Sequence, residues 1–275
     1  MSENKESESL LCFEKVSVSF GTVQALKDVS FDVKTGETRI ILGAAGSGKT
    51  VLLKTAMGLN PVESGKVCLF NEDVTHKPEA ELFEIRRRLG MLFQESALFD
   101  SMTIAQNVAY PLLHQRANRM PLDKMEGAVR DSLRFVELEQ TMEKYPSELS
   151  GGMRRRVAIA RAVVTKPPLL LYDSPTAGLD PITAHTIMAL IVKERDANAT
   201  TALVVTHRYQ DGNLIANFRY NSERRELEPA RNGASQQART TFMVLKEGRL
   251  IFEGDQDSLE ASQDVYISKF VKPRE

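Results

Sequence analysis

The sequence predicts an α/β fold with a mainly parallel sheet covered by helices. The first observation is a strand-loop-helix pattern: an apolar run at 38–42 (TRIIL) enters a glycine-rich loop, and a helical pattern follows at 51–59 (VLLKTAMGL). The second is the return of apolar strand patterns at 169–173 (LLLYD) and 201–206 (TALVVT). Strands that alternate with helices in this way are typical of the α/β class.

The N-terminal part of the chain has β-character. Residues 1–10 (MSENKESESL) are polar and acidic, and we expect a disordered tail there, followed by a single domain over 11–275. Residues 11–20 alternate apolar and polar positions like a half-buried strand, and the pattern FGTVQALKDVSFDV at 20–33 indicates a hairpin to a second strand.

The pattern from 78 to 146 is helical, and we interpret it as an insertion with a helical subdomain at about 95–165. Near the C-terminus, two apolar runs (TFMVLKEG and RLIFEG) are separated by the turn at 246–248. That spacing predicts a final hairpin.

Composition limits the possible partners. The chain has 275 residues, of which 42% are hydrophobic and 27% charged, the profile of a folded protein of one or two domains. Its net charge of −1 provides no global field for nucleic acid or an anionic membrane, so phosphate binding requires local donors. Cys12 and Cys68 are too few for a disulfide framework and favour the cytoplasm. No apolar run approaches the roughly 18 residues of a spanning helix, so a membrane role would require a membrane partner.

Residues 43–50 (GAAGSGKT) match the phosphate-loop pattern G-x-x-x-x-G-K-[ST] between a predicted strand and a helix. Glycines let the backbone curl so that its N–H groups point at a phosphate beside a helix N-terminus. Lys49 would reach the β- and γ-phosphates, and the Thr50 hydroxyl would be a Mg²⁺ ligand. A chance glycine-rich turn is the alternative. The residues expected at the nucleotide are Gly43, Ala44, Ala45, Gly46, Ser47, Gly48, Lys49, Thr50 and Val51.

An acidic residue follows the strand pattern LLLYD. Asp173 at the exit of a buried strand can hold Mg²⁺ through water. Alone this is a weak indication, because apolar strands often end in an aspartate that starts a turn.

The stretch at 148–153 (ELSGGM) is a glycine-rich turn that leads into an amphipathic helix, a second place with anion-binding N–H groups. With this motif the chain closely resembles an ATP-binding-cassette (ABC) ATPase over residues 12–207 and again from 241. The resemblance implies a P-loop NTPase with a RecA-like core, an antiparallel β subdomain and a helical signature subdomain. It also implies ATP and Mg²⁺ as ligands, a second ABC ATPase subunit and an integral membrane permease as partners, and a place on the inner face of the membrane.

The resemblance also implies roles for single residues. Phe20 would stack on adenine, Gln94 would touch Mg²⁺ and the membrane partner, and His207 would contact the γ-phosphate. The LSGGM signature would complete the ATP site of the opposite subunit, and Asp180 lies in the dimer-contact loop. The signature residues are Ser150, Gly151, Gly152 and Met153. The arginines at 154–156 could suggest nucleic acid, but we interpret them as a solvated helix face with one or two local contacts, so no nucleic acid is expected.

A finer resemblance is to the ATPases of Mla/Mce-type lipid transport systems. It rests on Met153, where many cassettes have glutamine, and on the stretch at 92–112, LFQESALFDSMTIAQNVAYPL. This resemblance implies phospholipid or another lipid as the transported molecule.

Ser174 departs from the family pattern, in which a glutamate follows the aspartate and polarises the attacking water. A serine hydroxyl is neutral and cannot accept a proton near pH 7. Three accounts stay open: hydrolysis is slow, the chain pairs with a different subunit whose own site is complete, or Glu95 beside Gln94 substitutes for the missing carboxylate.

Residues 208–240 form a polar insertion that is longer than the usual connection, with six arginines and four acids. We interpret it as a solvated excursion. The alternative is a docking arm for a neighbouring subunit, because the segment also carries aromatic residues of the kind enriched at binding hot spots.

Overall fold

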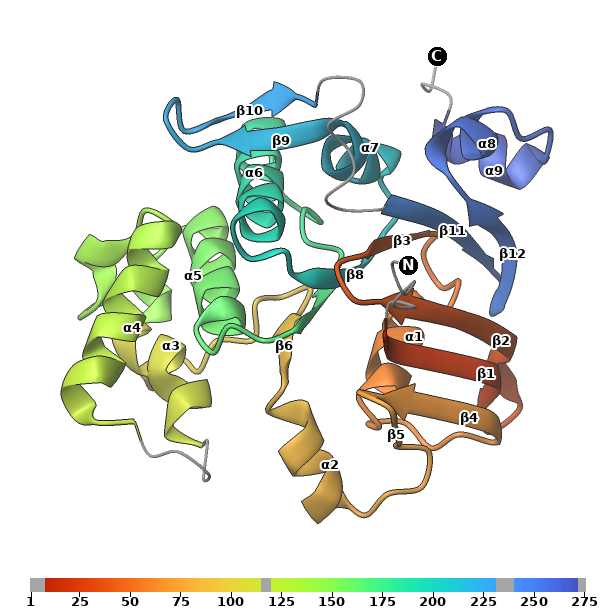
Figure 1. Cartoon of the computed structure of the whole chain (residues 1–275), viewed down its shortest axis with the longest axis horizontal. Helices are drawn as coiled ribbons and strands as arrows, with labels where there is room; N and C mark the ends of the chain where they lie inside the picture. The colour runs from red at the N-terminus through yellow and green to blue at the C-terminus, as the bar shows by residue number, and fades with distance from the viewer. Residues whose placement is uncertain (1–7, 115–119, 231–239, 272–275) are drawn as a thin grey trace, which may run out of the picture.

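The computed structural model describes residues 8–114, 120–230 and 240–271. Its centre is a six-stranded sheet in the order β12-β11-β3-β8-β7-β6 (Figure 1). The strands are β3 (Thr38–Leu42), β6 (Leu89–Leu92), β7 (Leu169–Asp173), β8 (Thr201–Thr206), β11 (Thr240–Lys246) and β12 (Arg249–Gly254). All neighbours pair in parallel except β11 and β12, which form the predicted C-terminal hairpin. The mainly parallel α/β fold is confirmed.

A second sheet of four antiparallel strands has the order β2-β1-β4-β5 (Figure 1, lower right). Its strands are β1 (Ser9–Phe20), β2 (Val23–Lys34), β4 (Ser64–Leu69) and β5 (Glu72–Asp73). The β1–β2 hairpin was predicted, whereas β4 and β5 were not. The predicted tail at 1–10 is too long, because β1 already includes Ser9 and the buried Leu10; residues 1–7 lie outside the described ranges.

The described helices flank both sheets (Figure 1). They are α1 (Lys49–Ala56), α2 (Glu79–Arg86), α3 (Ile104–Leu113), α4 (Leu122–Phe135), α5 (Gly151–Val163), α6 (Pro181–Asn198), α7 (Tyr209–Asn217), α8 (Gln256–Glu260) and α9 (Val265–Val271), with short 3₁₀ turns at Glu139–Thr141 and Pro146–Glu148. Helices α3, α4 and α5 pack on one another and form a separate group at one side of the molecule. None of the helices in the described ranges has the length and apolar character needed to cross a bilayer.

Strand β6 corrects the prediction of a continuous helical pattern from 78 to 146. Helix α2 ends at Arg86, and Leu89–Leu92 pairs in parallel with β7. A Cβ on Gly90 would lie 2.3 Å from the Ala162 carbonyl oxygen, so α5 packs directly on the backbone of this strand. The four-residue strand forms because β7 provides its hydrogen-bonding partners, and the local sequence pattern does not contain that information.

The segment at 208–240 is also ordered over most of its length, contrary to the predicted solvated excursion. After α7, strands β9 (Phe218–Asn221) and β10 (Glu226–Pro229) form an antiparallel hairpin that lies on α6 (Figure 1, top). The Arg195 guanidinium donates to the Phe218 carbonyl at 2.8 Å, and the Asp196 carboxylate accepts from the Tyr220 amide at 2.8 Å. Residues 231–239 lie outside the described ranges.

The two faces of the six-stranded sheet bury two separate cores, because side chains alternate along each strand. In β3, Ile40 and Leu42 belong to the core under the helices, whereas Ile41 belongs to the core under the antiparallel sheet and α1. Strand β8 alternates in the same way, with Val204 on one face and Val205 on the other. Burial on both faces explains the continuous apolar runs in the sequence.

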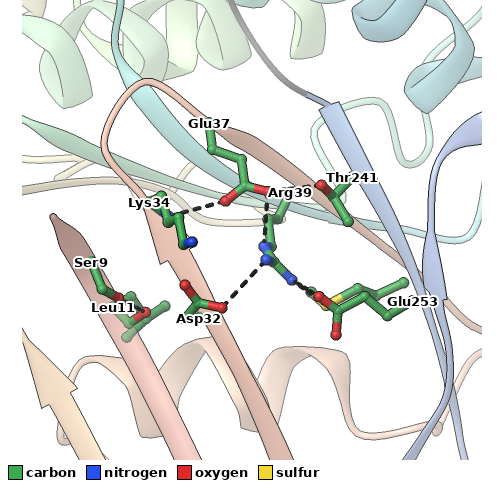
Figure 2. Close-up of polar contacts among 9 residues, drawn as sticks. Ser9, Leu11, Asp32, Lys34, Glu37, Arg39, Thr241 and Glu253 are labelled. Atoms are coloured by element: carbon green, nitrogen blue, oxygen red, sulfur yellow. Dashed lines mark hydrogen bonds and ion pairs between the residues drawn. The ribbon is translucent and has the colours of Figure 1, made fainter. Parts of the chain in front are cut away.

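An ion cluster around the buried Arg39 of β3 joins the two sheets (Figure 2). The guanidinium pairs with Asp32 of β2 at 3.5 Å, with Glu37 at 3.2 Å, and with Glu253 of β12. The Glu37 side chain is itself buried and accepts hydrogen bonds from the Thr241 hydroxyl (2.7 Å) and the Lys34 amide (3.0 Å). Arg39 therefore neutralises a carboxylate that the fold withdraws from water.

We expect Arg39→Met to lower the free energy of unfolding by about 3–5 kcal/mol, because it leaves a buried carboxylate unpaired. Urea denaturation provides the measurement. Arg130→Met is the control and should change the free energy of unfolding little, since the pairs of Arg130 with Glu126 and Glu139 are exposed and screened by solvent. Adding Glu37→Gln to Arg39→Met should recover part of the loss. Equal effects of Arg39→Met and Arg130→Met would contradict this account.

Candidate functional site

The loop between β3 and α1 is tightly curled. Gly46 and Gly48 have φ values of 76° and 106°, in the left-handed region that favours glycine. A Cβ on Gly43 would lie 2.5 Å from Ser47 Oγ and 2.6 Å from the Leu245 carbonyl oxygen. The glycine pattern read from the sequence is therefore required by the backbone, which wraps around the N-terminus of α1 as a phosphate loop does.

Lys49 points back into this loop and is only 8% exposed. Its ammonium donates to the carbonyls of Gly43 (2.8 Å) and Ala44 (2.7 Å) and lies 3.3 Å from Ser47 Oγ. Burial lowers the pKa of Lys49, and the nearby Asp173 carboxylate opposes that shift. The structure thus places one cation inside a ring of loop atoms, where a phosphate could replace the carbonyls as its partner.

Asp173 joins the two nucleotide motifs. Its side chain accepts from the Thr50 hydroxyl at 2.9 Å through one oxygen and from the Ser174 hydroxyl at 3.1 Å through the other. The carboxylate is 3% exposed. A carboxylate and a hydroxyl oxygen in contact are the hard oxygen donors that Mg²⁺ prefers, so the residues present fit this ion.

Ser174 begins the turn after β7 with a φ of 47°, and its amide donates to the Val205 carbonyl at 2.8 Å. The side chain is buried, and its hydroxyl is directed at Asp173. The position that a glutamate holds in the family therefore carries no charge here, while the turn remains tied to β8.

Gln94 and Glu95 follow β6 and are both exposed. Strand β6 pairs with β7 so that Leu92 lies opposite Tyr172, the residue before Asp173. The loop with Gln94 therefore leaves the same edge of the sheet as Asp173, as the carboxyl ends of parallel strands must.

His207 also reaches this edge, because it follows Thr206, which pairs with Leu42 immediately before the phosphate loop. The side chain is exposed. A nearby residue that the sequence did not identify is Asp211, which is buried and accepts from the hydroxyls of Thr206 (2.8 Å) and Thr176 (2.7 Å). Burial raises the pKa of Asp211. The sequence could have indicated Asp211 only through its spacing of four residues from His207, which is about one helical turn.

The signature motif lies at the start of α5, where Ser150 caps the helix and accepts from the Met153 amide at 3.2 Å. Asp180 caps α6 in the same way and accepts from the amides of Ile182 and Thr183. The two helix starts are close, since a Cβ on Gly152 would lie 2.5 Å from Thr183 Cγ2. No hydrogen bond within the described ranges joins the signature to the phosphate loop.

Phe20 ends β1 with 47% of its surface exposed, which leaves the ring available for stacking. By contrast, the arginines at 154–156 do not form the solvated face that was predicted. Arg154 is exposed, but Arg155 is buried and Arg156 is partly buried. Their guanidinium groups donate to backbone carbonyls of the protein itself.

Comparisons with known proteins agree with this geometry. The ABC transporter family model matches residues 26–177, more than half of the chain. The intermembrane phospholipid transport system ATP-binding protein MlaF of Haemophilus influenzae is 33% identical over 89% of this chain and 83% of that protein. The methionine import ATP-binding protein MetN of Corynebacterium efficiens is 41% identical over 70% of this chain, which spans about half the length of that relative (53%).

Solved structures are similar over nearly the whole chain. The dimeric post-hydrolysis structure of the ATP-binding cassette MJ0796 bound to ADP and Pi has a TM-score of 0.73 at 29% identity and covers 89% of this chain and 98% of that chain. CbiO1 of Clostridium perfringens has a TM-score of 0.75 at 26% identity, with 94% and 93% covered. This chain therefore belongs to the ABC transporter family, as an ATPase subunit that binds ATP.

Proposed function

We propose that this ATPase drives the transport of phospholipid or another lipid, as one of two ABC subunits that act on an integral membrane permease from the cytoplasmic side. The likeness to MlaF along 89% of the chain is the observation that carries the lipid assignment. Met153 and the stretch at 92–112 support it from the sequence. The relative MetN is a methionine import protein by name, and methionine is therefore the alternative to be tested.

The geometry suggests how the nucleotide is held. Loop amides and Lys49 would bind the triphosphate, with Phe20 against the base, while Thr50, Asp173 and Gln94 would hold Mg²⁺. The metal ion neutralises charge on the phosphates when it is bound. The signature serine and glycines lie at a helix start where Ser150 and Gly151 are exposed, which supports a role at the nucleotide of a second subunit. Closure around two nucleotides would favour one state of the permease, and hydrolysis or release would reset it.

Ser174 raises the question of whether this subunit hydrolyses ATP or only binds it. A positioned general base contributes about 10²- to 10⁴-fold to rate, and a serine hydroxyl cannot act as that base. The competing function is a nucleotide-gated binding subunit with negligible turnover, or the degenerate half of a heterodimeric ATPase. Glu95 remains a candidate substitute, because it is exposed on the loop that also carries Gln94.

Lys49→Ala should weaken MgATP binding by about 10- to 100-fold, because it removes a charged donor to the phosphates. Fluorescence titration with a nucleotide analogue measures the dissociation constant. Lys54→Ala on the exposed face of the same helix is the control and should bind like the wild type. Equal binding by the Lys49→Ala and wild-type chains would refute the phosphate-loop assignment.

Ser174→Glu should raise the ATPase rate of the assembled complex by up to about 10²-fold if the missing base limits turnover. Ser174→Gln is the matched control, since it has nearly the same size without the carboxylate. A wild-type rate above that of Lys49→Ala would exclude the binding-only version. Identical rates for the Glu and Gln variants would show that the absent carboxylate is not limiting.

The lipid assignment predicts that the complex, purified with its permease, hydrolyses ATP faster in phosphatidylethanolamine/phosphatidylglycerol nanodiscs that present transportable lipid than in detergent. L-methionine should not change the rate in detergent. Stimulation by methionine alone would overturn the assignment in favour of amino-acid import.

A further inference from the structure

Arg155 is a buried arginine that links three parts of the ATPase site. It lies in the second turn of α5, two residues after the signature, and is only 5% exposed. One terminal nitrogen donates to the Phe93 carbonyl at 3.1 Å, immediately before Gln94. The other lies 3.4 Å from the Ala177 carbonyl, in the turn that begins with Ser174. A single side chain therefore bridges the Gln94 loop and the Ser174 turn from the signature helix.

The guanidinium occupies this place at an energetic disadvantage. Burial lowers the pKa of Arg155, and the carboxylates of Asp173 and Glu95 oppose that shift. Its Nε has no hydrogen-bond partner within the described ranges. A buried charge with an unmatched donor is destabilising in itself, so its two loop contacts point to a role other than stability. The planar fork of arginine suits two carbonyls that lie on different segments.

The Gln94 loop requires such support. Ser96 and Ala97 have φ values of 65° and 49°, which are unfavourable for residues with a side chain. Arg161, one and a half turns further along α5, donates to the carbonyls of both residues at 2.8 Å. Arg155 and Arg161 thus hold the loop on either side of Gln94 and Glu95, but only Arg155 also reaches the Ser174 turn.

We propose that Arg155 is a positioning residue that fixes Gln94 relative to Ser174 and connects this spacing to the signature helix of the same subunit. With a neutral serine at 174, catalysis depends on the placement of water, Mg²⁺ and phosphate more than on proton abstraction. A device that sets the distance between the two loops then acts directly on turnover. The inference rests on the ATPase activity and does not depend on which molecule is transported.

The test compares Arg155→Gln with Arg156→Gln in the assembled complex. Arg156 lies on the same helix, but among the residues that the structure describes it donates only to the Val136 carbonyl, at 3.1 Å and away from both loops. Arg155→Gln should lower kcat by about 10²-fold, the effect of a misplacement of about 1 Å, with little change in KM for ATP. Arg156→Gln should leave both constants close to wild type, and Arg155→Lys should restore part of kcat through one of the two carbonyls.

A double-mutant cycle with Gln94→Ala separates positioning from general stability. If Arg155 acts through Gln94, Arg155→Gln should have little further effect on kcat in the Gln94→Ala chain. Additive losses, an unchanged kcat, or equal losses in Arg155→Gln and Arg156→Gln would overturn the proposal. If thermal denaturation shows that the Arg155→Gln chain is not folded, Arg155→Lys takes its place in the cycle.

The same variants are prepared in the Ser174→Glu chain, so the outcome does not depend on a slow wild-type reaction. A complex that turns over in either background but shows no Arg155 effect would refute the positioning role alone. The complex could also fail to hydrolyse ATP faster than Lys49→Ala, both with Ser174 and with Ser174→Glu. That result would refute the proposed transport function together with the role of Arg155.

Discussion

The hydrogen bond between Thr50 and Asp173, at 2.9 Å, is the interaction on which the rest of the site depends. It joins residues 123 positions apart in the sequence. The contact requires that β3, β8 and β7 lie next to one another in parallel, because only then do the phosphate loop and the acidic strand end leave the same edge of the sheet. The two buried cores, one on each face, fix that strand order and register.

Helix α5 adds a second constraint on the same edge. Its first turn carries the signature motif, and its later turns hold the Gln94 loop through two arginines. A helix is rigid over this length, so a displacement of one end is transmitted to the other. The hairpin β9–β10 lies on the neighbouring α6, and Lys193 of α6 lies 5.2 Å from the Tyr220 ring and 4.2 Å from the Phe135 ring at the end of α4. The insertion is thus tied to the junction between the core and the helical group.

The site combines buried cations with a buried carboxylate. Lys49 and Arg155 are buried cations, and the charge of the buried Asp173 carboxylate opposes the lowering of both pKa values by burial. With Ser174 in the place of the expected glutamate, Asp173 still accepts from the Thr50 hydroxyl, and Lys49 still donates to the Gly43 carbonyl. The Ser174 hydroxyl adds a further hydrogen bond to Asp173. Where a general base is missing, contacts that position the reacting groups become more important.

The sequence by itself determined the phosphate loop, the strand before it and the helix after it, since these depend on a short motif with fixed local spacing. It also identified Asp173 at the end of an apolar strand pattern, whereas the roles of Ser150 and Asp180 came from the resemblance to the ABC family. Only the tertiary structure decided that Leu89–Leu92 is a strand, that 218–229 is a hairpin, and that Arg155 and Asp211 are buried. In each of these cases the deciding partner is a distant strand, helix or carbonyl, and a local pattern of residue types cannot specify which distant group will be present.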